Sequence, residues 1–344
     1  SYDAILRFFN EAATDPKVQE IYITLYRVAS DSKIVNALIS AAKNGKKVSV
    51  LVELKARFDE ANNIKWAKKM KEAGVKISYS VTALKVHAKI ALVKRQNGLR
   101  TSYVGLLATG NFNETTANFY TDHILMTANS DLLREMELLF IFLAKRVKPS
   151  DTEFIQYNHL LVAQFNLQET FLALITQEME NARAGKKAEI TIKLNNLEEK
   201  VLINKLYEAS NAGVKVNLIV RGICRLIPGV KDLSENISVT RIVDRYLEHG
   251  RVFVFHNLGD TKIYLGSADW MNRNIYRRIE VCFPVLDEDI KKQLLAMLAL
   301  QLQDNLKAVK IDSDMKNMPV ANKNEPIQSQ YRIYQLLNEQ NHES

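Results

Sequence analysis

Short apolar runs alternate with amphipathic stretches along the first 80 residues of the chain. Continuous or alternating apolar positions predict three strands, at residues 18–26, 48–52 and 75–79. Between them, apolar residues recur at helical spacing over residues 34–42 and 62–73. This β-α-β-α-β order predicts a parallel sheet with helices on its faces, so the expected fold class is α/β.

A fourth strand is predicted over residues 84–93, where apolar positions alternate after His87. Side chains two positions apart on a strand point to the same face, so His87 and Lys89 are expected to lie together. This pair suits a phosphate, because the imidazole can attack phosphorus or move a proton while the lysine neutralises the oxyanions. Taken alone, the pair favours the simpler interpretation of a solvated strand edge.

The segment that follows changes this interpretation. Asn97-Gly98 predicts a hairpin, after which residues 108–113 form a glycine-containing loop of small polar residues. Thr109 and Asn111 of this loop could cradle phosphate oxygens. A polar loop of this kind after a His-x-Lys pair favours a phosphate-handling site.

The second half of the chain repeats the first. Gly45 and Gly213, 168 positions apart, each end a predicted helix and precede an alternating strand. The same offset matches Glu53 with Arg221. The repeat indicates two related halves with the same order of elements.

A second basic pair, His249-x-Arg251, also precedes a glycine-containing polar loop, at residues 266–274. Two halves with one such site each predict two α/β/α domains related by a pseudo-twofold axis, with the active site in the cleft between them. The polar stretch 148–151 gives the strongest boundary signal. The predicted domains are residues 1–148 and 149–344.

Two arginines lie just past predicted strand ends. Arg27 and Arg57 follow the first and second strands, and polar residues at the carboxyl ends of parallel strands gather in one crevice. For either arginine alone, a surface ion pair is the simpler interpretation.

Composition narrows the class of partner. The 344 residues carry a net charge of +8, which favours polyanions such as nucleic acid, nucleotides, polyphosphate or anionic lipid. The two cysteines, Cys224 and Cys282, lie far apart without zinc-site spacing, which is typical of reduced cysteines in a cytosolic protein. No apolar run approaches the ~18 residues of a membrane-spanning helix.

The two ends of the chain carry less information. The chain starts at Ser1 rather than Met and has no signal peptide, so it is expected to be a piece of a longer protein. The tail after residue 312 is polar and is expected to pack loosely, apart from a short helix near residues 331–337.

In its motifs, the chain resembles the phospholipase D superfamily. Within that superfamily it is similar to the C-terminal half of the bacterial polyphosphate kinase family, the type that forms a phosphohistidine. The motifs that carry this resemblance are Leu25-Tyr26-Arg27, the segment 52–59, His87-Ala88-Lys89, the segment 109–113, Tyr120-Thr121-Asp122, Val220-Arg221-Gly222, Glu248-His249 and the segment 267–271.

The resemblance implies an enzyme that makes polyphosphate reversibly from the γ-phosphate of ATP. By it, His87 would be the nucleophile that becomes phosphorylated, with Lys89 beside it in the catalytic set. Tyr120 would lie against adenine, and Arg221 would hold the phosphates. His249 would face His87 across the cleft, with acid–base and phosphate-binding roles.

The same resemblance implies Mg²⁺ near Arg27 and Arg57. A guanidinium group has no lone pair to offer a metal, so both arginines are expected to hold the phosphates that hold the ion. Thr109 and Asn111 would complete the phosphate site.

The resemblance also implies partners and a location. ATP, ADP and inorganic polyphosphate would be the substrates, and no specific nucleic acid is expected. The family's two N-terminal domains are not found in this sequence, and the full-length protein is expected to form a homo-oligomer. A bacterial cytoplasmic location is expected, with association at the membrane periphery left open.

Three departures separate the chain from the phosphodiesterases of the superfamily. Those enzymes carry an aspartate seven residues after each histidine, where this chain has Lys94 and His256. Arg251 replaces the lysine of the second motif. Glu248 precedes His249, and a neighbouring carboxylate favours imidazolium, so His249 is expected to act in acid–base chemistry rather than as nucleophile.

Two other functions stay open at this point. One is a phosphodiesterase or nuclease that uses the same two histidines. The other is a non-catalytic module that binds polyanions through its basic cleft.

Overall fold

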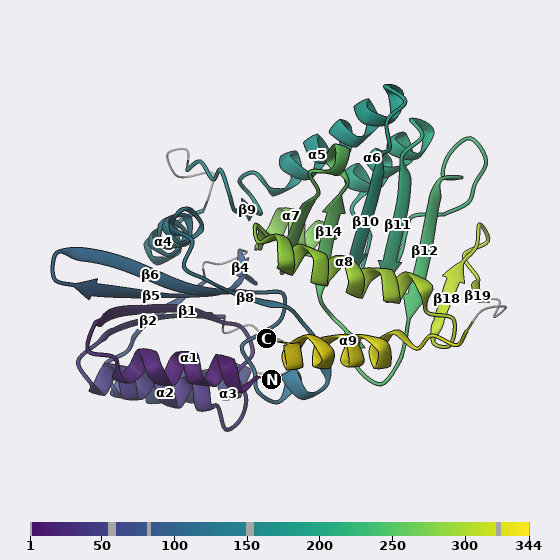
Figure 1. The fold of residues 1–344 in the computed structure, drawn as a ribbon. Helices are drawn as coiled ribbons and strands as arrows, with labels where there is room; N and C mark the ends of the chain where they lie inside the picture. The colour runs from purple at the N-terminus through teal and green to yellow at the C-terminus, as the bar shows by residue number, and fades with distance from the viewer. Residues whose placement is uncertain (1, 54–59, 81–83, 149–154, 321–324, 344) are drawn as a thin grey trace.

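The computed structural model describes residues 2–53, 60–80, 84–148, 155–320 and 325–343. The first half forms a six-stranded sheet in the order β3-β2-β1-β5-β6-β8 (Figure 1). The three strands predicted first are parallel, and the last three add antiparallel. Their bounds are β1 Val18–Leu25, β2 Lys47–Val52, β3 Lys76–Tyr79, β5 Lys89–Asn97, β6 Arg100–Ala108 and β8 Ile124–Thr127. The predicted parallel sheet and the hairpin at Asn97-Gly98 are confirmed.

Helices cover both faces of this sheet, as Figure 1 shows. Three pack on one face in an apolar cluster of their own, and one packs on the other face. They are α1 Asp3–Thr14, α2 Lys33–Lys43 and α3 Glu60–Glu72 on the first face, and α4 Ser130–Lys145 on the second. Because both faces are covered, β5 is buried at every position from Lys89 to Val93.

The second half repeats this topology strand for strand. Its sheet contains the order β12-β11-β10-β14-β15-β17, extended by β18 and β19 at one edge and by β9 at the other. The bounds are β9 Leu161–Val162, β10 Glu189–Leu194, β11 Lys215–Val220, β12 Ile237–Ile242, β14 Arg251–Phe255, β15 Lys262–Gly266, β17 Val281–Pro284, β18 Ala308–Ile311 and β19 Asn317–Pro319. Gly45 and Gly213 both have positive φ, 81° and 92°, after a helix in the same position of each half. The predicted repeat is therefore confirmed.

The helices of the second half match those of the first in part, because residues 221–236, which join β11 to β12, form no helix that corresponds to α3. The longer helices are α5 Leu167–Arg183, α6 Lys200–Asn211 and α8 Glu288–Gln303, with the short helix α7 Asn272–Arg277 after β15. Helices α5 and α6 share an apolar cluster with one face of the sheet. Helix α8 instead shares a cluster with α4 and with residues of both sheets. The α4–α8 layer is thus a central core that belongs to both halves.

The link between the halves is held by a buried carboxylate of α4. Glu135 accepts main-chain hydrogen bonds from Asn158 at 2.7 Å and from Leu160 at 2.8 Å. These two residues lead directly into β9 of the second sheet. The predicted boundary at 148/149 adjoins residues 149–154, which lie outside the described residues, and stays a prediction.

Two short parallel ribbons cross between the halves. In one, β4 Lys85–Val86 pairs with β16 Arg278–Ile279. In the other, β7 Tyr120–Thr121 pairs with β13 Leu247–Glu248. The strand predicted over residues 84–93 is therefore interrupted, because His87 and Ala88 form the link between the ribbon strand β4 and β5, which begins at Lys89.

The expectation of a loosely packed tail after residue 312 is wrong in part. Residues 313–319 are exposed, but β19 pairs with β18, which in turn pairs with β12. The last helix is longer than predicted, α9 Ser329–Glu343, and the buried Ser329 at its start donates its main-chain N–H to Asp304 at 2.7 Å. Polar composition misled the prediction, because the contacts that hold this tail are themselves polar.

Within the described part of the chain, no helix has both the length and the apolar content that crossing a membrane requires.

The core shared by the two halves predicts which leucine of α4 contributes most to the free energy of unfolding. Leu139 of α4 is fully buried in the central cluster, whereas the neighbouring Leu138 is 46% exposed. We expect Leu139→Ala to lower the free energy of unfolding by about 2–5 kcal/mol, because it leaves a cavity between the halves. Leu138→Ala, the matched control, should change it by about 0.5 kcal/mol. Urea titrations followed by circular dichroism measure both, and equal effects would contradict a shared core.

Candidate active site

Each crossing ribbon brings a histidine of one half against a carboxylate of the other. Directly after β4 and β16, Nδ1 of His87 lies 2.8 Å from Oε2 of Glu280. The ribbon sets this contact, because the main-chain N–H groups of His87 and Ala88 both donate to the carbonyl oxygen of Ile279, at 2.9 and 3.0 Å.

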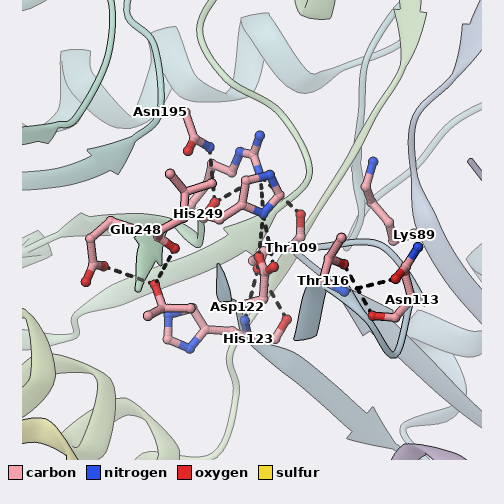
Figure 2. Close-up of polar contacts among 12 residues, drawn as sticks. Lys89, Thr109, Asn113, Thr116, Asp122, His123, Asn195, Glu248 and His249 are labelled. Carbon is pink, nitrogen blue, oxygen red and sulfur yellow. Dashed lines mark hydrogen bonds and ion pairs between the residues drawn. The ribbon is translucent and has the colours of Figure 1, made fainter. Parts of the chain in front are cut away.

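The second ribbon repeats the same geometry. Nδ1 of His249 lies 2.8 Å from Oδ1 of Asp122, as Figure 2 shows. The main-chain N–H groups of His249 and Gly250 both donate to the carbonyl oxygen of Thr121, at 3.2 and 2.8 Å. An ionised carboxylate only accepts, so opposite one each histidine would carry its proton on Nδ1 and have a lone pair on Nε2.

A hydroxyl from the polar loop of each half orients each carboxylate. Thr109 donates to Asp122 at 2.7 Å, and Ser267 donates to Glu280 at 2.5 Å. Gly110 is required beside this contact, since a Cβ there would lie 2.0 Å from Oδ2 of Asp122. The loop predicted to cradle phosphate thus holds the carboxylate of its own half, and a direct phosphate contact of Thr109 stays a prediction.

The environment of His87 favours the neutral imidazole. Burial lowers the pKa of His87 well below its ordinary value, and the charges of Lys89, Arg278 and Arg251 lower it further. Burial also raises the pKa of Glu280. Among the described residues, no donor is found for Nε2 of His87. With the proton on Nδ1, this nitrogen carries a lone pair that no described donor engages.

Lys89 lies beneath the same imidazole. Its ammonium group donates to the carbonyl oxygen of His87 and lies 5.2 Å from the centre of the Tyr26 ring, whose edge meets His87. Burial lowers the pKa of Lys89 well below its usual range. An anionic phosphate placed here would restore the lysine charge, because a nearby opposite charge favours the ionised form.

His249 differs from His87 in the guanidinium that lies against its ring. Nη1 of Arg251 lies 3.3 Å from Nδ1 and 3.2 Å from Nε2 of His249, so it faces the imidazole ring rather than the lone pair of one nitrogen. Burial lowers the pKa of His249, and the charge of Arg251 lowers it further against the opposing effect of Asp122. The expectation of an imidazolium at this position is wrong, since burial and the guanidinium outweigh the carboxylate.

The expectation that the carboxylate of Glu248 acts on His249 is also wrong. Glu248 directs its carboxylate away from His249 toward Lys193, Gln301 and Gln330 (Figure 2 shows Glu248 turned aside). Neighbours in sequence on a strand point to opposite faces, so the adjacent carboxylate cannot serve the histidine. Asp122, from the other half, is the residue that does.

A chain of polar contacts links Arg251 to Arg221. Arg251 binds the carboxylate of Asp269, with Nε and Nη2 each 3.2 Å from an oxygen. Burial by itself raises the pKa of Asp269, but Arg251 and the N–H of Asn195 hold it at about 2. Asn195 in turn accepts from Nε of Arg221 at 2.6 Å and donates to the carbonyl oxygen of His249 at 3.1 Å. The predicted phosphate ligand Arg221 therefore lies one side chain away from His249.

Tyr120 and Asn111 line an open pocket beside the second histidine. The centre of the Tyr120 ring lies 4.9 Å from that of His249. Together with Gly110 and Asp122, these residues line a pocket with a volume of about 540 Å³. The Oδ1 atom of Asn111 is buried without a donor among the described residues.

The predicted magnesium residues are only partly described. Arg27 follows β1, with its guanidinium 6.0 Å from the centre of the Tyr26 ring that meets His87, and its carbonyl oxygen accepts from Asn113 at 3.4 Å. Arg57 lies outside the described residues. In the part of the chain that the structure describes, no group of three or more His, Cys, Asp or Glu side chains could hold a metal.

Sequence reasoning missed the two carboxylates. Asp122 belonged to a recognised motif but had no role assigned, and Glu280 was not singled out at all. A signal was present, because each histidine of the pair is followed by a carboxylate at similar distance, in Asp122 after His87 and Glu280 after His249. What the sequence conceals is that each carboxylate serves the histidine of the other half.

Comparison with solved structures shows which proteins share this fold. A crystal structure of polyphosphate kinase from Porphyromonas gingivalis superposes with a TM-score of 0.92 at 45% identity, over 100% of this chain and 52% of that one. Phosphatidylserine synthase from Haemophilus influenzae, with a TM-score of 0.61 at 13% identity over 97% of this chain and 90% of that one, shares the fold alone. The predicted fold class of two related α/β/α halves is thereby confirmed.

Sequence comparison covers the same region. The polyphosphate kinase of Vibrio cholerae serotype O1 is 45% identical over 341 residues, 98% of this chain and 48% of that protein. The chain thus spans about half the length of the curated relatives it matches. The family models described as polyphosphate kinase C-terminal domain 1 and domain 2 match residues 1–149 and 160–330. The chain therefore belongs to the polyphosphate kinase family and carries its C-terminal domains 1 and 2.

Proposed function

We propose that this chain is the catalytic half of an ATP:polyphosphate phosphotransferase that works through a phosphohistidine on His87. The observation that carries the proposal is the buried His87–Glu280 pair, which fixes the proton on Nδ1 and presents Nε2 with its lone pair. Family membership supports the reaction, since the relatives that match over nearly the whole chain are polyphosphate kinases.

The first step forms a bond from Nε2 of His87 to the γ-phosphorus of ATP. The bond from that phosphorus to the β–γ bridging oxygen breaks, and ADP leaves with the electron pair. In the second step a terminal phosphate oxygen of polyphosphate attacks the same phosphorus, and the P–N bond breaks to restore the imidazole. Both steps run in reverse, and both depend on alignment and charge neutralisation more than on delivery of a proton to the leaving group.

Cations around the transferred group supply that neutralisation. Lys89 and Arg251 lie next to the two histidines, and Arg221 reaches the same region through Asn195. A preorganised cation in a buried site stabilises developing negative charge far more than one in water. We assign phosphate binding to these side chains and to Arg27, Arg57, Thr109 and Asn111.

His249 and Tyr120 complete the proposed site. His249, held by Asp122 and bridged to Arg251, is suited to exchange a proton at Nε2 with a phosphate oxygen. Tyr120 lines the pocket of about 540 Å³ beside it, which has an apolar wall from Ile124 and Met126. An aromatic side chain at the mouth of such a pocket suits the adenine of ATP.

The described carboxylates do not fit a magnesium site of their own. Asp122 and Glu280 are engaged by histidines, and Asp269 is engaged by Arg251. Mg²⁺ prefers a few oxygen ligands including substrate phosphates, so we propose that it enters bound to the nucleotide. There it would neutralise phosphate charge, with Arg27 and Arg57 holding the phosphates.

One argument against the phosphodiesterase alternative does not hold. Lys94, which replaces the aspartate of those enzymes, lies far along β5 and pairs with Glu137 of α4 at 3.2 Å. That departure is remote from the reacting groups and does not decide the chemistry. The choice between transfer and diester hydrolysis therefore belongs to an assay, and family membership favours transfer.

The rest of the protein, its oligomeric state and its location are also proposals. The N-terminal part that the relatives possess would complete the protein, and a homo-oligomer and a bacterial cytoplasmic location are expected from the family. These expectations stay predictions.

Labelling with γ-labelled ATP tests the proposed intermediate. We expect acid-labile, base-stable label on the peptide that contains His87, because a phosphoramidate has that stability. His87→Ala should abolish the label while the circular dichroism spectrum is retained, and His249→Ala should keep the label on the same peptide. Label on the His249 peptide, or label retained in folded His87→Ala, would refute the assignment. Hydrolysis of a diester without any label would favour the phosphodiesterase.

Substitution of Glu280 and substitution of Asp122 should slow different steps of the reaction. Glu280→Gln places an amide donor opposite Nδ1 of His87, which favours the tautomer with the proton on Nε2. We expect this variant to slow label formation by about 10²–10⁴-fold, the range for losing a positioned acid–base group. Asp122→Asn should slow polyphosphate synthesis more than label formation. Rapid-quench measurement of both steps checks this, and identical profiles for the two variants would contradict the swapped pairing.

A further inference from the structure

A buried carboxylate next to His249 gathers donors from four separate elements. Glu248 is 3% exposed, and its Oε2 accepts from Lys193 of β10 at 2.5 Å, Gln301 of α8 at 2.9 Å and Thr121 of β7 at 3.1 Å. Its Oε1 accepts from Nε2 of Gln330, on the last helix, at 2.7 Å. A buried charge needs such partners, so this cluster fixes whatever is attached to it.

Gln330 also binds the main chain just before that carboxylate. Its Oε1 accepts from the N–H of Tyr246 at 3.0 Å, and its Nε2 donates to the carbonyl oxygen of Tyr246 at 2.9 Å. One side-chain amide thus binds both main-chain polar groups of Tyr246, the residue just before β13. Helix α9 is itself anchored at this end, because Gln328 donates to Asp244 at 2.8 Å.

The residues held by this cluster lead directly into the second catalytic pair. Glu248 is followed by His249, and Thr121 is followed by Asp122. Both strands of the β7–β13 ribbon are therefore tied to the same carboxylate. We propose that Gln330 is a positioning residue, through which α9 sets the geometry of the His249–Asp122 pair.

The other ribbon is built differently. The residue before His87 is the apolar Val86, buried in the central core, in the position that Glu248 occupies before His249. In the described chain, the start of α9 contacts Asp304, and Gln330 contacts Tyr246 and Glu248 beside His249, whereas no contact of this helix with the β4–β16 ribbon is found. The helix should therefore act on one histidine and leave the other unchanged.

Nuclear magnetic resonance of the histidines tests this without requiring turnover. The chain has six histidines, so ¹⁵N-histidine labelling gives few signals, and His→Gln variants assign them. Gln330→Met keeps the shape of the side chain and removes its donor and acceptor. Gln335→Met is the matched control, because its amide on the same helix contacts only Arg332, at an exposed position.

We expect Gln330→Met to lower the population of the His249 tautomer with the proton on Nδ1 and to leave His87 unchanged. Gln335→Met should change neither. Gln330→Glu, which keeps the acceptor for Tyr246 and loses the donors, should act in the same direction and serves if the first variant is unstable. An unchanged His249 in a folded Gln330 variant, or equal changes at both histidines, would overturn the proposal.

A kinetic measurement adds to this test and rests on the proposed function. Gln330→Met should slow polyphosphate synthesis by about tenfold, as expected for a supporting contact, while His87 still takes label at the rate of the unaltered chain. If label is absent in every form of the chain, the proposed function fails, and the tautomer measurement still decides the role of Gln330.

Discussion

The structure depends on two imidazole–carboxylate contacts that cross between its halves. Each contact, His87 with Glu280 and His249 with Asp122, is 2.8 Å long and buried. Burying these groups is costly unless they are paired, so neither half offers a stable site alone. The ribbons that set the contacts, the shared α4–α8 core and the hydroxyls of Thr109 and Ser267 all serve to keep the two pairs in register.

The same arrangement gives the two histidines different chemistry within one geometry. Main-chain and hydroxyl contacts are equivalent at both, yet the guanidinium of Arg251 lies against the ring of His249, 3.3 and 3.2 Å from its two nitrogens, while Nε2 of His87 meets no donor in the described chain. A nucleophile needs its lone pair, and a group that exchanges protons benefits from a bridge to a cation. Asymmetry therefore arises from single side chains placed on a symmetric frame.

Much of this frame follows from the sequence. Apolar periodicity predicted the parallel strands of the first half, and the spacing of Gly45 and Gly213 revealed the repeat, because both features depend on local physics. The partners of the histidines did not follow, since pairing across a ribbon depends on register between distant segments. Glu248 shows the limit clearly, because adjacency in sequence places its carboxylate on the opposite side of the strand from His249. The ordered tail was missed for a similar reason, as its anchors at Asp304 and Glu248 are polar and lie in other elements.

The repeat of two halves within one chain has an evolutionary consequence. If a single half were a separate protein, it could complete its site only by pairing with a second copy, and every substitution would then occur twice. Joining the halves releases this constraint, because a change beside one histidine no longer forces the same change beside the other. Divergence between the two copies, such as Val86 in one and Glu248 in the other, is what a duplicated and fused ancestor makes possible.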